Sequence, residues 1–182
     1  VVHRKLHGIL VKSRRFDEAN RIRGRYSLRV PELPTLNEMQ GSGPHVMALA
    51  GESNVKLVPW EASAGWAVIA VVHPHCSPSR RAVDAIMRDP DLDWFRQRLT
   101  LLMPAGPSWL EEDMRKWNAQ HPRQAMVAEV PSHGIHGVRT DETPLFFLMK
   151  EGNVVDMLRG WPDDATKVSV WRERMAGAAA DP

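Results

Sequence analysis

The feature that most constrains the fold is an apolar run followed at once by a turn and a helical pattern. Residues 66–79 read WAVIAVVHPHCSPS. A short β-branched run bounded by turn residues is typical of a strand buried on both faces of a sheet. Cys76, the single cysteine, is therefore expected where a buried strand ends and a helix begins. This is where open α/β sheets place their chemistry, and where backbone N–H groups and the helix dipole favour a thiolate.

Strand and helix patterns alternate over the rest of the chain. The predicted strands are 53–60, 66–72, 99–103, 124–130, 144–149 and 153–158. The predicted helices are 78–88, a shorter one within 91–98, one from Ser108 to His121, and a last one capped by Asp163. Pro59 favours an edge position for the first strand, and Glu111 would complete a capping box with Ser108. This order predicts an α/β fold with a parallel core, a closing antiparallel hairpin and helices on both faces of a mixed sheet.

The N-terminal segment differs from the rest in charge. Residues 1–29 hold nine Lys and Arg against two acidic residues, a net charge of +7, so that the remainder carries −5. Two short helices are expected, the first with an apolar face and the second with a weaker one. The first face consists of Val2, Leu6, Ile9 and Leu10, and the second of Phe16, Ala19, Arg23 and Tyr26. We interpret the segment as a solvated helical pair that lies on the main domain, contacts a protein partner or forms a homodimer. No aromatic interleaving or known module indicates nucleic-acid binding.

Breaker residues set the domain boundaries. We predict a basic helical extension at 1–29, a Pro- and Gly-rich connector at 30–51, the main domain at 52–176 and a frayed tail at 177–182. A single cysteine excludes an intramolecular disulfide and a cysteine-rich metal site. No apolar run has the roughly 20 residues needed to span a membrane. The first residue is Val, which leaves open whether a leader was removed.

Three features together resemble the thioredoxin-fold superfamily over residues 53–176. Cys76-Ser77-Pro78-Ser79 stands at the position of the CxxC motif, with Ser79 in place of the second cysteine. Thr143-Pro144 stands where that superfamily has its cis-proline, and a hairpin, Gly160 and a helix end the chain as they do there. The His-Pro-His-Cys approach and the Thr-Pro pair look more like exported, periplasmic disulfide-handling proteins of bacteria than like cytosolic thioredoxin.

The resemblance implies a site and a chemistry. Its catalytic residues would be Cys76, Ser79 and Pro144, and its substrate-binding residues Thr143, His75 and Pro78. Without a second cysteine the chain cannot resolve a mixed disulfide by itself. The implied activity is therefore monothiol exchange, of the reductase or isomerase type, on protein or small-molecule thiols, with no cofactor. Ser79 could donate its hydroxyl to the sulfur, and the basic neighbours His73, His75, Arg80 and Arg81 would favour the thiolate.

Two other functions stay open from the residues. One is a non-catalytic binding or scaffold protein of a bacterial envelope assembly, since one fold hosts many functions. The other is a copper or zinc site formed by His73, His75 and Cys76 with His133 and His136 of a later loop. Histidines beside a reactive thiol are more often electrostatic tuners, which disfavours the metal site.

Overall fold

The computed structural model describes residues 1–36, 43–51, 54–60, 65–161 and 166–177. The chain divides into two compact units, residues 1–61 with 102–135, and residues 62–101 with 136–182. The described strands form a mixed sheet in the order β2-β1-β5-β4-β3-β6-β7. No helix in these described ranges is long and apolar enough to cross a membrane.

The second unit is built on the apolar run of the sequence. That run forms β3 (Trp66–Val71), which pairs antiparallel with β6 (Leu145–Lys150), and β6 pairs antiparallel with β7 (Asn153–Arg159). All positions of β3 after Trp66 are buried, as expected for a run without polar residues. The register sets Val71 opposite Leu145, so the residues that follow β3 lie beside those that precede β6.

Helices of this unit contribute to a cluster of buried aromatic residues. They are α3 (Ser77–Arg88), α4 (Asp93–Arg96) after a 3-10 turn at Pro90–Leu92, and α6 (Thr166–Gly177). Phe95 packs against Phe146 and Trp171, with ring centroids 6.4 and 6.3 Å apart. The buried indole N–H of Trp171 donates to Asp156 on β7 at 2.9 Å, which satisfies its one polar atom. A further strand, β4 (Leu99–Met103), follows α4.

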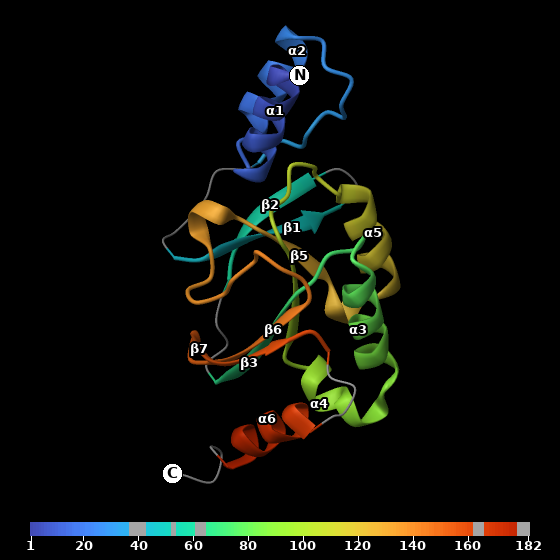
Figure 1. Ribbon diagram of the computed structural model, residues 1–182, viewed down its shortest axis with the longest axis vertical. Helices are drawn as coiled ribbons and strands as arrows, with labels where there is room; N and C mark the ends of the chain where they lie inside the picture. Colours follow the sequence, from blue (N-terminus) through green and yellow to red (C-terminus); the bar gives the residue numbers. More distant parts are fainter. Residues whose placement is uncertain (37–42, 52–53, 61–64, 162–165, 178–182) are drawn as a thin grey trace. The chain divides into compact units, whose positions relative to one another are not determined.

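The first unit contains the other strands and the N-terminal helices (Figure 1). Its strands are β1 (His45–Ala50), β2 (Asn54–Pro59) and β5 (Met126–Glu129), and β1 pairs antiparallel with both of the others. Its helices are α1 (Val2–Lys12), α2 (Phe16–Arg25) and α5 (Glu111–Gln120), with 3-10 turns at Pro122–Gln124 and Pro131–His133. The amide of Asn20 on α2 bonds both the carbonyl and the N–H of Leu33, which fixes the chain after the helix pair.

The predicted element types and their order are confirmed, and one strand was missed. β1 lies inside the segment 30–51 that was interpreted as a connector. The breakers around it made the segment look irregular. Gly43 and Gly51, both at positive φ, instead mark the two ends of the strand. Residues 37–42 of the connector, the expected cap Asp163 and the tail residues 178–182 lie outside the described ranges.

Two local predictions were wrong. The third long helix begins at Glu111, and Leu110 rather than Ser108 occupies its cap position. The carboxylate of Glu111 accepts a hydrogen bond from Trp109 and pairs with Arg115, so it is not available for a capping box. The buried face of α1 is also rotated from the predicted one. Its buried residues are His7, Leu10 and Val11, whereas Val2, Leu6 and Ile9 are exposed.

Candidate active site

The site begins with the turn that joins β3 to α3. The N–H of Cys76 donates to the carbonyl of His73 at 3.0 Å, which closes a four-residue turn with Pro74 at its second position, where proline is favoured. Cys76 has extended φ and ψ of −86° and 114° and is the residue at which α3 is capped. Pro78 is in the first turn of the helix, where a missing N–H costs nothing. The local sequence thus places a half-buried sulfur at a helix N-terminus.

The antiparallel register of β3 and β6 supplies the other side of the site. Thr143 and Pro144 directly precede β6, and the peptide bond between them is cis. The Cys76 thiol donates to the carbonyl of Thr143, with Sγ and O 3.5 Å apart. Pro144 is buried and Thr143 is half-buried, so the sulfur contacts main chain at the start of the hairpin strand.

The Ser79 side chain is a polar group beside the sulfur of Cys76. It is 1% exposed, and its hydroxyl oxygen accepts a hydrogen bond from the His73 N–H at 3.3 Å. The same hydroxyl also hydrogen-bonds the sulfur of Cys76. Burial raises the pKa of the Cys76 thiol, but hydrogen bonds from the side chains of Ser79 and Thr143 and from the Ser79 backbone N–H, with the positive charge of Arg81, outweigh it and hold that pKa below its ordinary value.

Basic residues near the thiol have different roles. Arg81 is held by a hydrogen bond from its Nη1 to the Ser77 hydroxyl at 2.9 Å and lowers the pKa of the Cys76 thiol. The ring Nδ1 of His73 lies 3.2 Å from the backbone nitrogen of His75 and accepts its hydrogen bond, which braces the turn. His75 and Pro78 are exposed on either side of Cys76 in the chain. The turn therefore offers an open approach to a partly buried sulfur.

Comparison with known proteins identifies the architecture. No protein-family model matches the sequence, and no curated protein matches it. An uncharacterized thioredoxin-like protein from Porphyromonas gingivalis has a similar solution structure, with a TM-score of 0.51 and 13% identity over 74% of this chain and 91% of that one. The C-terminal domain of an uncharacterized protein from Bacteroides fragilis matches 77% of this chain and 98% of that one at a TM-score of 0.46 and 12% identity.

The chain has the thioredoxin fold. Within it, Cys76, Ser79, Thr143 and Pro144 come together in one unit, from a strand-to-helix turn and the start of a hairpin strand. The sequence reasoning named all four. It missed the backbone N–H of His73 as the partner of Ser79, because no residue pattern signals a main-chain donor.

The histidines of this thioredoxin fold do not assemble around the thiol. His133 packs against His45, with ring centroids 5.7 Å apart, and His136 is exposed. Within the described ranges, no three His, Cys, Asp or Glu side chains lie close enough together to hold a metal ion. The proposed convergence of the loop histidines with Cys76 is therefore not found there.

Proposed function

We propose that this protein carries out thiol–disulfide exchange through Cys76 alone. The observation that carries the proposal is the half-buried sulfur at the start of α3, where the Ser79 hydroxyl and Arg81 lower its pKa. A thiolate is the attacking species in disulfide exchange, so a lowered pKa raises the fraction of reactive protein near neutral pH.

The chemistry balances with an external thiol as co-reactant. The Cys76 thiolate attacks one sulfur of a substrate disulfide, forms a mixed disulfide and releases the other sulfur as a thiolate. A low-molecular-weight thiol then attacks the substrate sulfur of that mixed disulfide. A new external disulfide forms and Cys76 leaves as a thiolate. Ser79 cannot take the part of a resolving cysteine, but its hydroxyl stabilises the negative sulfur both before attack and on departure.

The backbone at Thr143 is the proposed docking point for the substrate. Its carbonyl lies 3.5 Å from Sγ, and in the thiol form it accepts the S–H hydrogen. Once the thiol has ionised, that carbonyl is available to an N–H of an extended segment placed beside Pro144, as in pairing with a sheet edge. His75 and Pro78, both exposed, would contact the same segment. These features favour a disulfide within an extended, accessible stretch of polypeptide.

We also propose that the protein works outside the cytoplasm of a bacterium, where disulfide substrates persist. The sequence supports this through the His-Pro-His-Cys approach and the Thr143-Pro144 pair, which resemble exported disulfide-handling proteins. Recovery of native protein in the envelope fraction of its host would support the location, and recovery in the cytosol alone would contradict it.

A non-catalytic binding role is the second candidate, and Ser79 is the observation that favours it. A site that has lost its second thiol retains the docking backbone at Thr143 without the ability to complete a reaction unaided. In that case Cys76→Ser would bind extended peptides as well as the wild-type chain does, and no mixed disulfide would be required.

Incubation with a disulfide-containing peptide, followed by intact mass measurement, distinguishes the two. The wild-type chain should gain one peptide thiol per molecule, and an excess of glutathione should remove it. Cys76→Ser should gain nothing, whereas Ser77→Ala, which removes a neighbouring exposed hydroxyl, should still form the adduct. The exchange function is wrong if the native protein forms no adduct while the denatured chain does.

A further inference from the structure

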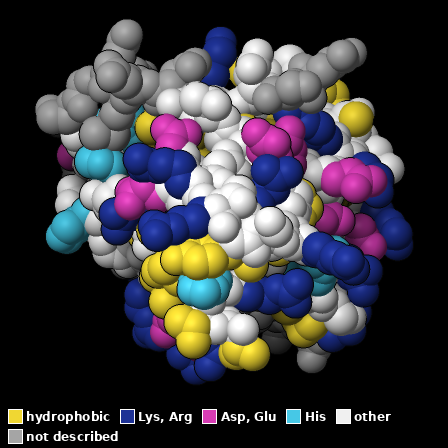
Figure 2. Space-filling view, turned by 90° about the horizontal axis from the view of Figure 1, so that it is seen from above, with side chains coloured by type: hydrophobic (Ala, Val, Ile, Leu, Met, Phe, Trp, Pro, Cys, Tyr) yellow, Lys and Arg dark blue, Asp and Glu magenta, His cyan; other side chains and the backbone are white. Residues whose placement is uncertain are grey.

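Helix α1 has apolar side chains on two faces. One face is exposed to solvent, and the other is buried. Val2, Leu6 and Ile9 are 73%, 39% and 62% exposed and follow one another at spacings of four and three residues, so they form one stripe along the helix. His7, Leu10 and Val11 are the residues that pack. We call the three exposed residues the α1 stripe. In Figure 2, hydrophobic side chains lie between Lys and Arg side chains in the lower half of the view.

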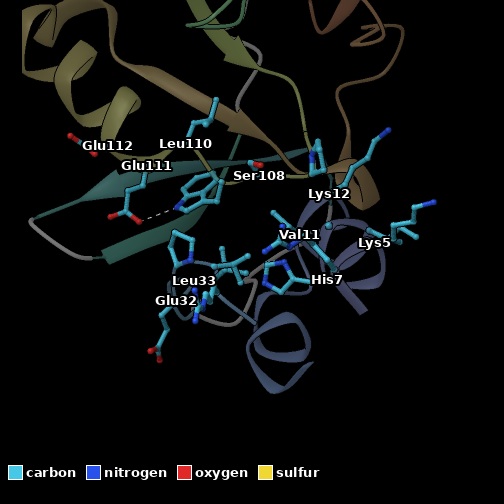
Figure 3. Close-up of a pocket in the computed structure, with 18 of the residues that line it drawn as sticks. Lys5, His7, Val11, Lys12, Glu32, Leu33, Ser108, Leu110, Glu111 and Glu112 are labelled. Atoms are coloured by element: carbon cyan, nitrogen blue, oxygen red, sulfur yellow. Dashed lines mark hydrogen bonds between the residues drawn. The ribbon is translucent and has the colours of Figure 1, made fainter. Parts of the chain in front are cut away.

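A groove continues from the stripe. It has a volume of about 1160 Å³ and lies between α1, residues 29–33 and residues 107–113, all within the first unit (Figure 3). Its apolar lining includes Val11, Leu33, Trp109 and Leu110. Ile9 belongs to both the groove and the α1 stripe, so the two form one continuous apolar surface.

The charges around this surface are uneven. Four cations line this surface: Arg4, Lys5, Lys12 and Arg29. None of the four forms a salt bridge with an acidic residue of the described ranges. Most of its acids are paired with cations: Glu32 with Arg23 at 3.3 Å, Glu111 with Arg115 at 2.6 Å, and Glu112 with Lys116 at 2.7 Å. In Figure 3, Lys5 and Lys12 extend on the α1 side of the groove and Glu111 and Glu112 lie on the opposite side. The uncompensated charge is therefore positive and is concentrated beside the α1 stripe.

We propose that α1 binds the surface of an anionic lipid bilayer, with the α1 stripe entering the headgroup region. Exposed apolar residues flanked by Lys and Arg on a single helix are the pattern of helices that lie in a membrane interface. The long basic side chains reach lipid phosphates while their methylenes stay beside the apolar residues. A second copy of the chain fits less well, because two α1 surfaces would bring unpaired cations together. We choose a bilayer surface rather than an acidic protein as the binding partner. The α1 stripe is narrow and lies on a single helix, as in helices that lie in a membrane interface.

Sedimentation with vesicles tests this proposal. The full chain should bind mixed phosphatidylglycerol–phosphatidylcholine vesicles, bind phosphatidylcholine vesicles weakly, and lose its binding as salt increases. Lys5→Gln with Lys12→Gln should lower the partition coefficient by about fivefold for each charge removed. Leu6→Ser with Ile9→Ser should lower it by about tenfold.

Matched controls change similar residues elsewhere. Val155→Ser with Val170→Ser removes two other exposed apolar side chains, and Lys56→Gln with Arg123→Gln removes two other exposed cations. Both control pairs should bind vesicles like the wild type within about twofold. Unchanged thermal unfolding would show that the α1 variants remain folded, as expected from changes at exposed positions.

Three results would overturn the proposal. The first is failure of the full chain to sediment with anionic vesicles at low salt. The second is equal loss of binding in the control and α1 variants, which would indicate a diffuse charge effect. The third is a dimer in light scattering that Leu6→Ser with Ile9→Ser dissociates, because the α1 stripe would then bind a second copy. None of these results depends on the reactivity of Cys76, so they leave the exchange function to its own test.

Discussion

Two buried polar side chains, Ser79 in the first turn of α3 and His7 on the packed face of α1, differ in whether their polar atoms are hydrogen-bonded. Ser79 is 1% exposed, and its hydroxyl both accepts from the His73 N–H and acts on the Cys76 sulfur. His7 is 6% exposed, and its Nε2 has no hydrogen-bond partner within the described ranges. Burial, followed by the charge of Arg23, lowers the pKa of His7.

The difference between Ser79 and His7 shows which buried polar groups are fixed by hydrogen bonds. A satisfied buried network fixes one geometry, while an unsatisfied polar atom costs stability. Arg14, at the end of the α1–α2 turn, repeats the pattern of His7. Its Nε donates to the Glu129 carbonyl, but Nη1 and Nη2 have no hydrogen-bond partner among the residues that the structure describes, and the guanidinium lies over the rings of Trp109 and Phe16. Burial lowers the pKa of Arg14 to about 10. The thiol site is therefore tightly specified, and the packing of the N-terminal helices is not.

The largest effect is expected for Ser79→Ala. The substitution removes the hydroxyl that accepts from the His73 N–H and should reduce the free energy of unfolding by about 1–2 kcal/mol. It also removes the main hydrogen bond that opposes burial in setting the pKa of Cys76. Alkylation of Cys76 near neutral pH should then slow by about two- to tenfold. Denaturant unfolding and alkylation kinetics measure the two effects.

Ser77→Ala is the matched control for stability, because its exposed hydroxyl accepts from the Arg81 side chain and not from a buried backbone N–H. It should leave the free energy of unfolding within about 0.5 kcal/mol of the wild type. Equal behaviour of the two alanine variants would contradict the role assigned to Ser79.

For His7→Leu we expect a smaller change in the free energy of unfolding, in the stabilising direction. Replacing an unpartnered buried imidazole by an apolar side chain should stabilise the protein by about 1 kcal/mol near pH 7.5. Because the folded pKa of His7 is lowered, the wild type keeps its full stability above the unfolded pKa of about 6.5 and loses stability as pH falls through the folded value. The advantage of His7→Leu should therefore grow between pH 7 and pH 5.

His121→Leu is the control for His7→Leu. It makes the same substitution at a half-buried histidine that stacks on Trp117. A His7→Leu variant that is less stable than the wild type at every pH would show that the imidazole stabilises the packed face of α1, and the contrast with Ser79 would fail.

The sequence predicted the local structure around Cys76 better than that of the N-terminal region, for physical reasons. Around Cys76 the information is local and strong: a buried run, two prolines, one cysteine and a Thr-Pro pair. In α1 the apolar residues occur on two faces, so periodicity could not decide whether Val2 and Ile9 or His7 and Val11 pack. The sequence did not predict the strand β1, because the glycines around it are typical of a linker. Its pairing with β2 and β5 depends on tertiary structure, which no local pattern indicates.

The pH dependence of Cys76 alkylation in the intact native protein is the decisive measurement, because a single sulfur reports the reaction. We expect the alkylation rate to reach half its maximum at a pH below the value of about 8.5 expected for an unperturbed cysteine, and that midpoint to shift upward in Ser79→Ala. A midpoint at or above the unperturbed value, or a sulfur that reacts only after unfolding, would contradict this expectation.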